Sequence, residues 1–208
     1  MNYLEALGRR YSVKKFNGEI IPQEILYPIL ESGKLSASSL GLQPYKILVV
    51  ESKTMKQKLI PAFYNPSQIS TCSHLIVLVS KKMLEENYVD GYFRHISEVR
   101  GVPAESLDPF RKSISQHIDQ KSRDELFHWA EKQSYIVLAN LMYAAALENV
   151  DTCPMEGFRQ DVIEELLETD PETEKVTVTL ALGYRSEEDH FQYLKKVRKP
   201  NEKLFTFI

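Results

Sequence analysis

The chain has 208 residues, 43% of them hydrophobic and 26% charged, which fits one globular domain over residues 1–208 with a sizeable core. Its formal net charge of −3 argues against a dedicated nucleic-acid-binding protein, because such proteins carry a basic excess that replaces phosphate counterions. The two cysteines, Cys72 and Cys153, lack metal-ligand spacing, so a reducing, cytoplasmic location is expected.

The N-terminal residues predict neither a signal peptide nor a membrane anchor. No basic segment followed by an apolar run opens the chain. The longest mostly apolar run, residues 135–147, is shorter than a membrane span and contains Asn140. We therefore expect neither a membrane nor a nucleic acid among the partners.

Apolar residues at helical spacing predict most of the helices. Pro22 suits the first turn of one helix, and Ser52 caps the start of another. In chain order the predicted helices cover residues 2–9, 22–33, 52–60, 122–149 and the segment after 158 through about Leu167.

Three apolar segments predict strands. Residues 45–52 and 74–81 are continuous apolar runs, so both faces of these strands should be covered. Residues 175–185 alternate and then run apolar, which predicts a further strand. Residues 151–158 are expected to form a loop.

Two segments do not fit a simple core. Residues 82–120 are more polar, are interrupted by Gly101 and two prolines, and are expected to form a helical excursion. The last residues, 203–208, are mostly apolar and resemble a strand. Such an end needs cover from its own domain or from a partner.

The absent motifs limit the chemistry. The sequence has no G-x-G-x-x-G after a strand, no phosphate-binding P-loop and no nucleophile elbow. Its five histidines have no metal-ligand spacing, so no metal site is expected. An anionic cofactor would therefore depend on cationic side chains.

Two basic clusters lie near the ends of the chain. The first contains Arg9, Arg10, Lys14 and Lys15, and the second is residues 195–198. If residues 11–16 are extended, Arg10 and Lys14 point to one face with Ser12, while Arg9 and Lys15 point to the other as surface charge. Together the clusters could bind a terminal phosphate. Each alone also fits a solvated charge run, and spacing does not show that they meet.

Three further stretches favour a ligand site. Residues 36–50 combine small and polar side chains before a buried strand, and residues 64–68 offer amides at Asn65 and Gln68. Residues 153–158 suit a turn whose backbone N–H groups face a ligand. Each stretch alone equally fits an ordinary connection.

The order of these stretches resembles the FMN-dependent nitroreductase family, most closely its oxygen-insensitive NAD(P)H nitroreductase and dihydropteridine reductase branch. The resemblance runs from about Leu4 to Pro200 through R-x-S-x-K-x-F, S-S-x-x-x-Q-P-Y, N-x-x-Q, P-x-E-G-F and K-x-R-x-P. It implies an α+β fold with a central, mostly antiparallel sheet flanked by helices. It also implies a homodimer whose C-terminal strands are exchanged.

The resemblance further implies a set of FMN-binding residues. Arg10 would hold the phosphate together with the second basic cluster, Lys14 would face the N1/O2 side of the ring, and the backbone of Glu156 would lie near N5. No side chain is expected to be catalytic, because N5 carries the hydride. The implied residues are Arg10, Ser12, Lys14, Ser38, Ser39, Gln43, Asn65, Gln68, Pro154, Met155, Glu156, Gly157, Lys196 and Arg198.

The activity implied is an NAD(P)H oxidoreductase with bound FMN. NADH or NADPH would give hydride to the flavin and leave, and a nitroaromatic, quinone or pterin-like acceptor would then take two electrons in a ping-pong cycle. The chain departs from the branch at Gln68, where lysine is frequent, and at Leu40 and Gly41. A flavin-binding protein with little turnover, for storage or sensing, stays open, as does a helical interaction protein.

Overall fold

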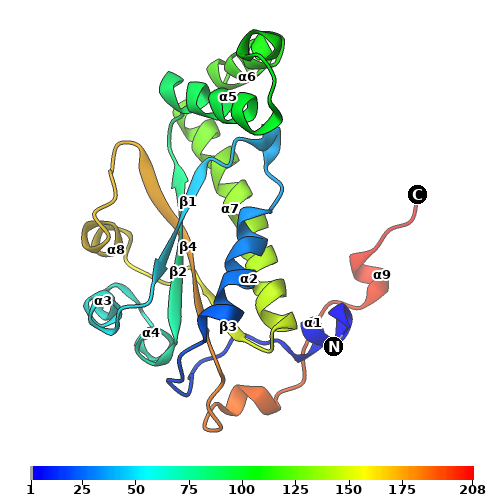
Figure 1. Ribbon diagram of the computed structural model, residues 1–208. Helices are drawn as coiled ribbons and strands as arrows, with labels where there is room; N and C mark the ends of the chain where they lie inside the picture. Colours follow the sequence, from blue (N-terminus) through cyan, green and yellow to red (C-terminus); the bar gives the residue numbers. More distant parts are fainter. Residues whose placement is uncertain (1) are drawn as a thin grey trace.

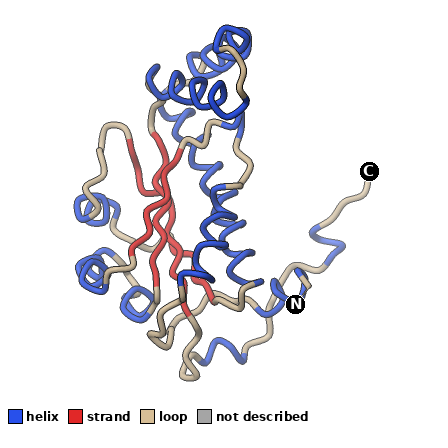
Figure 2. Tube along the Cα trace, viewed as in Figure 1, coloured by secondary structure: helices blue, strands red, loops and turns tan. Residues whose placement is uncertain are grey.

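The computed structural model describes residues 2–208, and its centre is an antiparallel sheet of four strands (Figures 1 and 2). The strand order is β1-β2-β4-β3, and every neighbouring pair is antiparallel. The strands are β1 (Tyr45–Val50), β2 (His74–Lys81), β3 (Asp151–Met155) and β4 (Glu174–Gly183).

Helices cover both faces of this sheet (Figure 1). One face carries α2 (Gln23–Lys34) and α7 (Arg123–Leu147). The other carries α3 (Lys53–Leu59), α4 (Pro66–Thr71) and α8 (Gln160–Leu166). Strand β2 is buried along nearly its whole length, which confirms the prediction from its continuous apolar run that both of its faces are covered. The same prediction does not hold for β1, which lies at an edge of the sheet and is mostly only half-buried. Strand β4 is buried along nearly its whole length as well.

Hydrogen bonds from capping side chains begin two of the helices at the positions that the sequence predicts. Ser122 caps α7 and forms a capping box with Glu125, and Asn2 and Glu5 do the same for α1 (Tyr3–Arg9). Helix α4 was missed, because six residues after Asn65 also suit a surface turn. Among residues 2–208, no helix is both long and apolar enough to cross a membrane.

The prediction of a loop over residues 151–158 was wrong in its first half. Asp151–Met155 pairs with β4 from Asp151↔Gly183 to Met155↔Thr179 and forms the edge strand β3. An edge strand tolerates Pro154, because no neighbouring strand on its outer side requires a backbone N–H from this position. Local sequence did not show the strand, because β4 supplies its hydrogen bonds from more than twenty residues away.

The helical excursion consists of α5 (Glu86–Arg100) and α6 (Asp108–Asp119), joined by a 3-10 turn at Ala104–Leu107. It stands at one end of the sheet and has an apolar core of its own. That core contains Leu42, Val89, Phe93, Ile96 and Ile114.

The C-terminal segment leaves the body of the chain (Figures 1 and 2). A 3-10 turn, His190–Tyr193, is followed by the single helical turn α9 (Asn201–Leu204) and an extended end. The predicted strand-like end therefore begins only after Leu204. Phe207 is 96% exposed, so none of the residues from 2 to 208 covers it.

Candidate functional site

Residues 11–16 lie beside β3, which they contact at Ser12. Ser12 forms a parallel bridge with Thr152, and the Val13 N–H donates to the Thr152 carbonyl over 3.2 Å. Phe16 bridges Arg185 just after β4. Since Val13 and Phe16 are buried, they anchor this segment to the core while Ser12 and Lys14 stay partly exposed.

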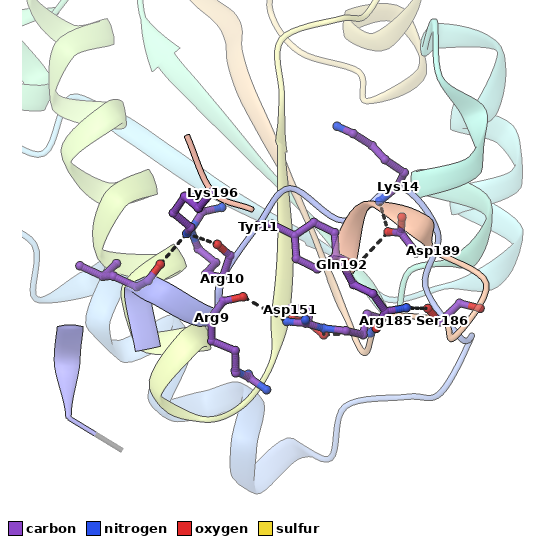
Figure 3. Close-up of polar contacts among 11 residues, drawn as sticks. Arg9, Arg10, Tyr11, Lys14, Asp151, Arg185, Ser186, Asp189, Gln192 and Lys196 are labelled. Carbon is purple, nitrogen blue, oxygen red and sulfur yellow. Dashed lines mark hydrogen bonds and ion pairs between the residues drawn. The ribbon is translucent and has the colours of Figure 1, made fainter. Parts of the chain in front are cut away.

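The two basic clusters meet in space (Figure 3). They line one cavity of about 520 Å³ at the end of the sheet where α1 lies. Charged and aromatic side chains share this lining, and the cations are Arg9, Arg10, Lys14, Arg185, Lys195, Lys196 and Arg198. The convergence is a property of the tertiary structure that sequence spacing did not show.

The electrostatics of this cavity are those of an anion site. One terminal nitrogen of Arg10, Nη1, is buried and has no hydrogen-bond partner among residues 2–208. Burial, and after it the charge of Arg198, lowers the pKa of Arg10. Burial likewise lowers the pKa of Lys196, with Arg10 and Arg198 adding repulsion. A bound anion would relieve this repulsion and satisfy the unpaired donor.

Lys196 has a structural task as well. Its ammonium donates to the Leu7 carbonyl over 2.6 Å and to the Arg10 carbonyl, so it fastens the C-terminal segment to the end of α1 (Figure 3). Lys15 pairs with Glu188 on the surface, as expected. Arg9, expected to face away as surface charge, instead lines the same cavity as Arg10.

A smaller cavity of about 180 Å³ adjoins the first through Lys14, which lines both. Asn65 and Gln68 reach it from the start of α4. Gln68 is only 4% exposed, and its Oε1 has no hydrogen-bond partner among residues 2–208. The other residues lining this cavity are Phe63, Cys153, Pro154, Met155, Glu156 and Gly157.

The turn after β3 is held from several sides. The Tyr135 hydroxyl, from α7, donates to Glu156 Oε1 over 2.6 Å. The Tyr64 N–H donates to the Gly157 carbonyl over 3.1 Å, and Phe63 bridges Phe158. The turn therefore has a fixed position at the rim of the smaller cavity.

The loop with Ser38, Ser39 and Gln43 lines neither of these two cavities. The Ser39 N–H donates to Gln133 Oε1 over 2.8 Å, and the Gln43 side-chain amide donates to the Lys34 carbonyl over 2.9 Å. Within residues 38–43, three residues have a positive φ: 60° at Leu40, 72° at Gly41 and 46° at Gln43. Within one chain the structure does not bring this loop to the other predicted site residues.

Sequence reasoning missed two carboxylates that support the site. Asp189 is 3% exposed and accepts the Lys14 N–H over 2.7 Å. Asp151 accepts the Arg185 Nε–H over 2.9 Å. No motif distinguished Asp189 from its acidic neighbours, residues 187 and 188, so its burial could be found only from the fold.

The fold and the site define a class: α+β proteins in which a segment near each end of the chain contributes to one cationic cavity beside an antiparallel sheet. The model of the nitroreductase family matches residues 7–184 of this chain. The chain therefore belongs to the nitroreductase family.

Relatives agree in sequence and in fold. A Staphylococcus haemolyticus protein named as an NAD(P)H nitroreductase is 36% identical over 217 aligned residues, covering 99% of this chain and 96% of that protein. A Staphylococcus epidermidis structure described as an NAD(P)H:FMN oxidoreductase has a TM-score of 0.87 at 24% identity and covers 100% and 96% of the two chains. An Exiguobacterium sibiricum nitroreductase in complex with FMN has a TM-score of 0.86 at 22% identity, with 100% and 98% covered.

Proposed function

We propose that the chain is an FMN-dependent NAD(P)H oxidoreductase. In this proposal it reduces nitroaromatics, quinones or pterin-like acceptors by two electrons in a ping-pong cycle. The observation that carries the proposal is the pair of cavities joined at Lys14, one rich in cations and one lined by amides and a turn. The names of the relatives and the FMN complex of a structural neighbour support it.

The residues present suit FMN in charge and hydrogen bonding. Arg10 and Arg198 would hold the phosphate, since Arg10 offers an unpaired buried donor and Lys196 is occupied by two carbonyls. Ser12 lines the same cavity as these two arginines. When bound, FMN supplies the hydride and electron transfer chemistry.

The ring side of the site would tune that chemistry. Lys14 places a cation between the two cavities, where it would stabilise negative charge on a reduced ring. Asn65 and Gln68 would contact polar ring atoms, and the turn from Pro154 to Gly157 would present backbone N–H groups. Gln68 has an unpaired carbonyl oxygen, which needs a donor when water is excluded. No side chain is required as a nucleophile.

We also propose a homodimer, supported by exposed apolar surface. Tyr135 and Ile136 on α7 are 38% and 41% exposed, and Phe205 and Phe207 in the C-terminal segment are 55% and 96% exposed. A second copy would cover these side chains, with exchange of the C-terminal segments. Ser38, Ser39 and Gln43 lie away from both cavities, so in this proposal they complete the site of the other copy.

In this proposal residues 1–208 form one FMN-binding domain, and the protein functions in the cytoplasm. Both cysteines are buried and unpaired, which supports a reducing compartment. A flavin-binding protein with little turnover is the second candidate. The neutral Gln68 favours it, because a glutamine stabilises an anionic reduced ring less than a lysine does.

The test is direct. The purified protein should carry, or take up, a flavin that absorbs near ~450 nm. NADH or NADPH added without oxygen should bleach this absorbance, and a quinone or nitroaromatic should restore it. A protein that cannot be reconstituted with FMN overturns the proposal. A yellow protein that neither nicotinamide bleaches supports the second candidate.

A further inference from the structure

We propose that Asp189 is a positioning residue that fixes Lys14 and the C-terminal cations relative to each other; this inference rests on the proposed function. Asp189 is buried, and both of its carboxylate oxygens are used. Oδ2 accepts the N–H groups of Lys14 and Lys15 over 2.7 and 3.3 Å and the Tyr11 hydroxyl over 3.1 Å. Oδ1 accepts the Phe191 N–H over 3.1 Å.

These contacts join the two ends of the chain. Asp189 follows Lys14 by 175 residues, yet one carboxylate binds the backbone of the N-terminal segment and starts the turn His190–Tyr193 (Figure 3). Lys196 and Arg198 follow the end of this turn, Tyr193, by three and five residues. The carboxylate thus sets where the second basic cluster begins relative to the first.

Asp189 also holds both members of a side-chain contact inside the site. The Lys14 ammonium lies 5.9 Å from the centroid of the Phe191 ring, within range of a cation–π interaction. Each of these two residues gives its backbone N–H to a different oxygen of Asp189. A change at Asp189 would therefore move the Lys14 ammonium, the cation shared by both cavities.

Only a carboxylate satisfies all of these donors. An asparagine offers one acceptor oxygen, and its NH₂ group would face an N–H of Lys14 or of Phe191. Burial raises the pKa of Asp189, but the N–H groups of Lys14, Phe191 and Lys15 outweigh burial, so the net pKa is lowered. Among residues 2–208 no cation pairs directly with Asp189, so its charge is stabilised by N–H and O–H donors.

The test compares Asp189→Asn with the control Asp170→Asn. Asp170 also accepts a backbone N–H, from Glu172 over 2.9 Å, but it lies in an exposed turn away from both cavities. Hydrogen exchange of the protein without cofactor should show about tenfold weaker protection of the Lys14 and Phe191 amides in Asp189→Asn alone, the scale of one lost hydrogen bond. Unchanged protection in both variants overturns the inference.

A double-mutant cycle tests the role toward the cofactor. By flavin fluorescence, Lys14→Gln should raise the Kd for FMN about tenfold in the wild-type chain, as loss of one charge-assisted contact does. In Asp189→Asn the same change should raise it less than threefold, because the ammonium is already displaced. In the Asp170→Asn background, Lys14→Gln should again raise the Kd for FMN about tenfold, as it does in the wild-type chain. Equal factors in all three backgrounds overturn the inference.

Two outcomes separate this inference from the proposed function. A wild-type chain that does not bind FMN overturns the proposed function and this inference with it. A wild-type chain that binds FMN but shows an additive cycle overturns the inference alone. If Asp189→Asn does not fold, Tyr11→Phe removes one donor to Oδ2, and the same cycle in that background should show a smaller departure from additivity.

Discussion

Asp151 at the start of β3 binds Arg185 just after β4 through the side chain and the backbone. The Arg185 Nε–H and backbone N–H each donate to Asp151 Oδ2 over 2.9 Å. The hydrogen bond with Asp151 is the main cause that raises the pKa of Arg185, although burial lowers it. The Arg185 guanidinium also lies over the Tyr11 ring, 4.7 Å from its centroid, and both residues line the 520 Å³ cavity.

Because Asp151 is 4% exposed, removing one member of this pair leaves a buried charge without its partner. We expect Arg185→Met to lower the free energy of unfolding by about 3 kcal/mol. Urea denaturation would measure this change. The double variant Asp151→Leu/Arg185→Met is the control, since it removes both charges and should lose less stability. Equal losses in the single and double variants would contradict the role given to the pair.

The phosphate assignment predicts a difference between FMN and riboflavin. Arg10→Gln should raise the Kd for FMN by about ten- to a hundredfold, because one charge-assisted contact to phosphate is lost, and should leave riboflavin binding nearly unchanged. Titration of flavin fluorescence checks both ligands. Lys15→Gln is the matched control, since Lys15 pairs with Glu188 and lines neither cavity of the site. Equal weakening of both flavins would place Arg10 away from the phosphate.

Gly41 and Gly18 separate backbone strain from crowding. Both have positive φ, 72° and 82°, but a Cβ on Gly41 would lie 2.5 Å from the Tyr92 hydroxyl, whereas one on Gly18 would meet nothing within 4 Å. Gly18→Ala should cost about 1–2 kcal/mol of stability from strain alone, and Gly41→Ala should cost more.

The additional loss of stability in Gly41→Ala should come from a clash with the Tyr92 hydroxyl. This hydroxyl donates a hydrogen bond to the Leu40 carbonyl over 2.9 Å. In a Tyr92→Phe background the nearest ring atom, Cζ, would be 3.5 Å from the new Cβ, an ordinary contact. We therefore expect the cost of Gly41→Ala to approach that of Gly18→Ala there. Thermal unfolding of the four variants decides, and a cost at Gly41 that does not depend on Tyr92 would refute the explanation.

Acid should weaken the fold through Glu174, whose side chain is 8% exposed between Lys46 and Lys81. Burial raises the pKa of Glu174, but hydrogen bonds from the two lysines outweigh burial and lower it. A lowered folded-state pKa gives stability that is complete above the unfolded value of about 4.3 and is lost as pH falls through the folded value. Urea denaturation from pH 7 to pH 3 should show a shallower decline for Glu174→Gln than for the wild-type chain.

The C-terminal segment should control the oligomeric state. Removing residues 201–208 takes away the exposed apolar side chains Phe205 and Phe207. If the full chain is the proposed dimer, we expect the shortened chain to sediment as a monomer at the same concentration and to bind FMN more weakly. Lys203→Ala is the control, because it alters the same segment without reducing its apolar surface. A shortened chain that stays dimeric would refute strand exchange as the source of the dimer.

The sequence by itself determined the elements whose signals are local. The apolar runs of β2 and β4, the capping box of α7 and the alternation of Arg10, Ser12 and Lys14 follow from the period of a strand or helix and from nearby hydrogen-bonding partners. The ordered motifs also indicated the family, which the family model matches.

Only the tertiary structure decided what depends on distant partners. β3 exists because β4 pairs with it, and the two basic clusters form one site because the segments that carry them line the same cavity. Asp189 is indistinguishable in sequence from the two acidic residues before it. In the folded chain it is buried and accepts hydrogen bonds from four donors. A local pattern reports which face a side chain takes, whereas desolvation and charge repulsion arise only where distant segments come together.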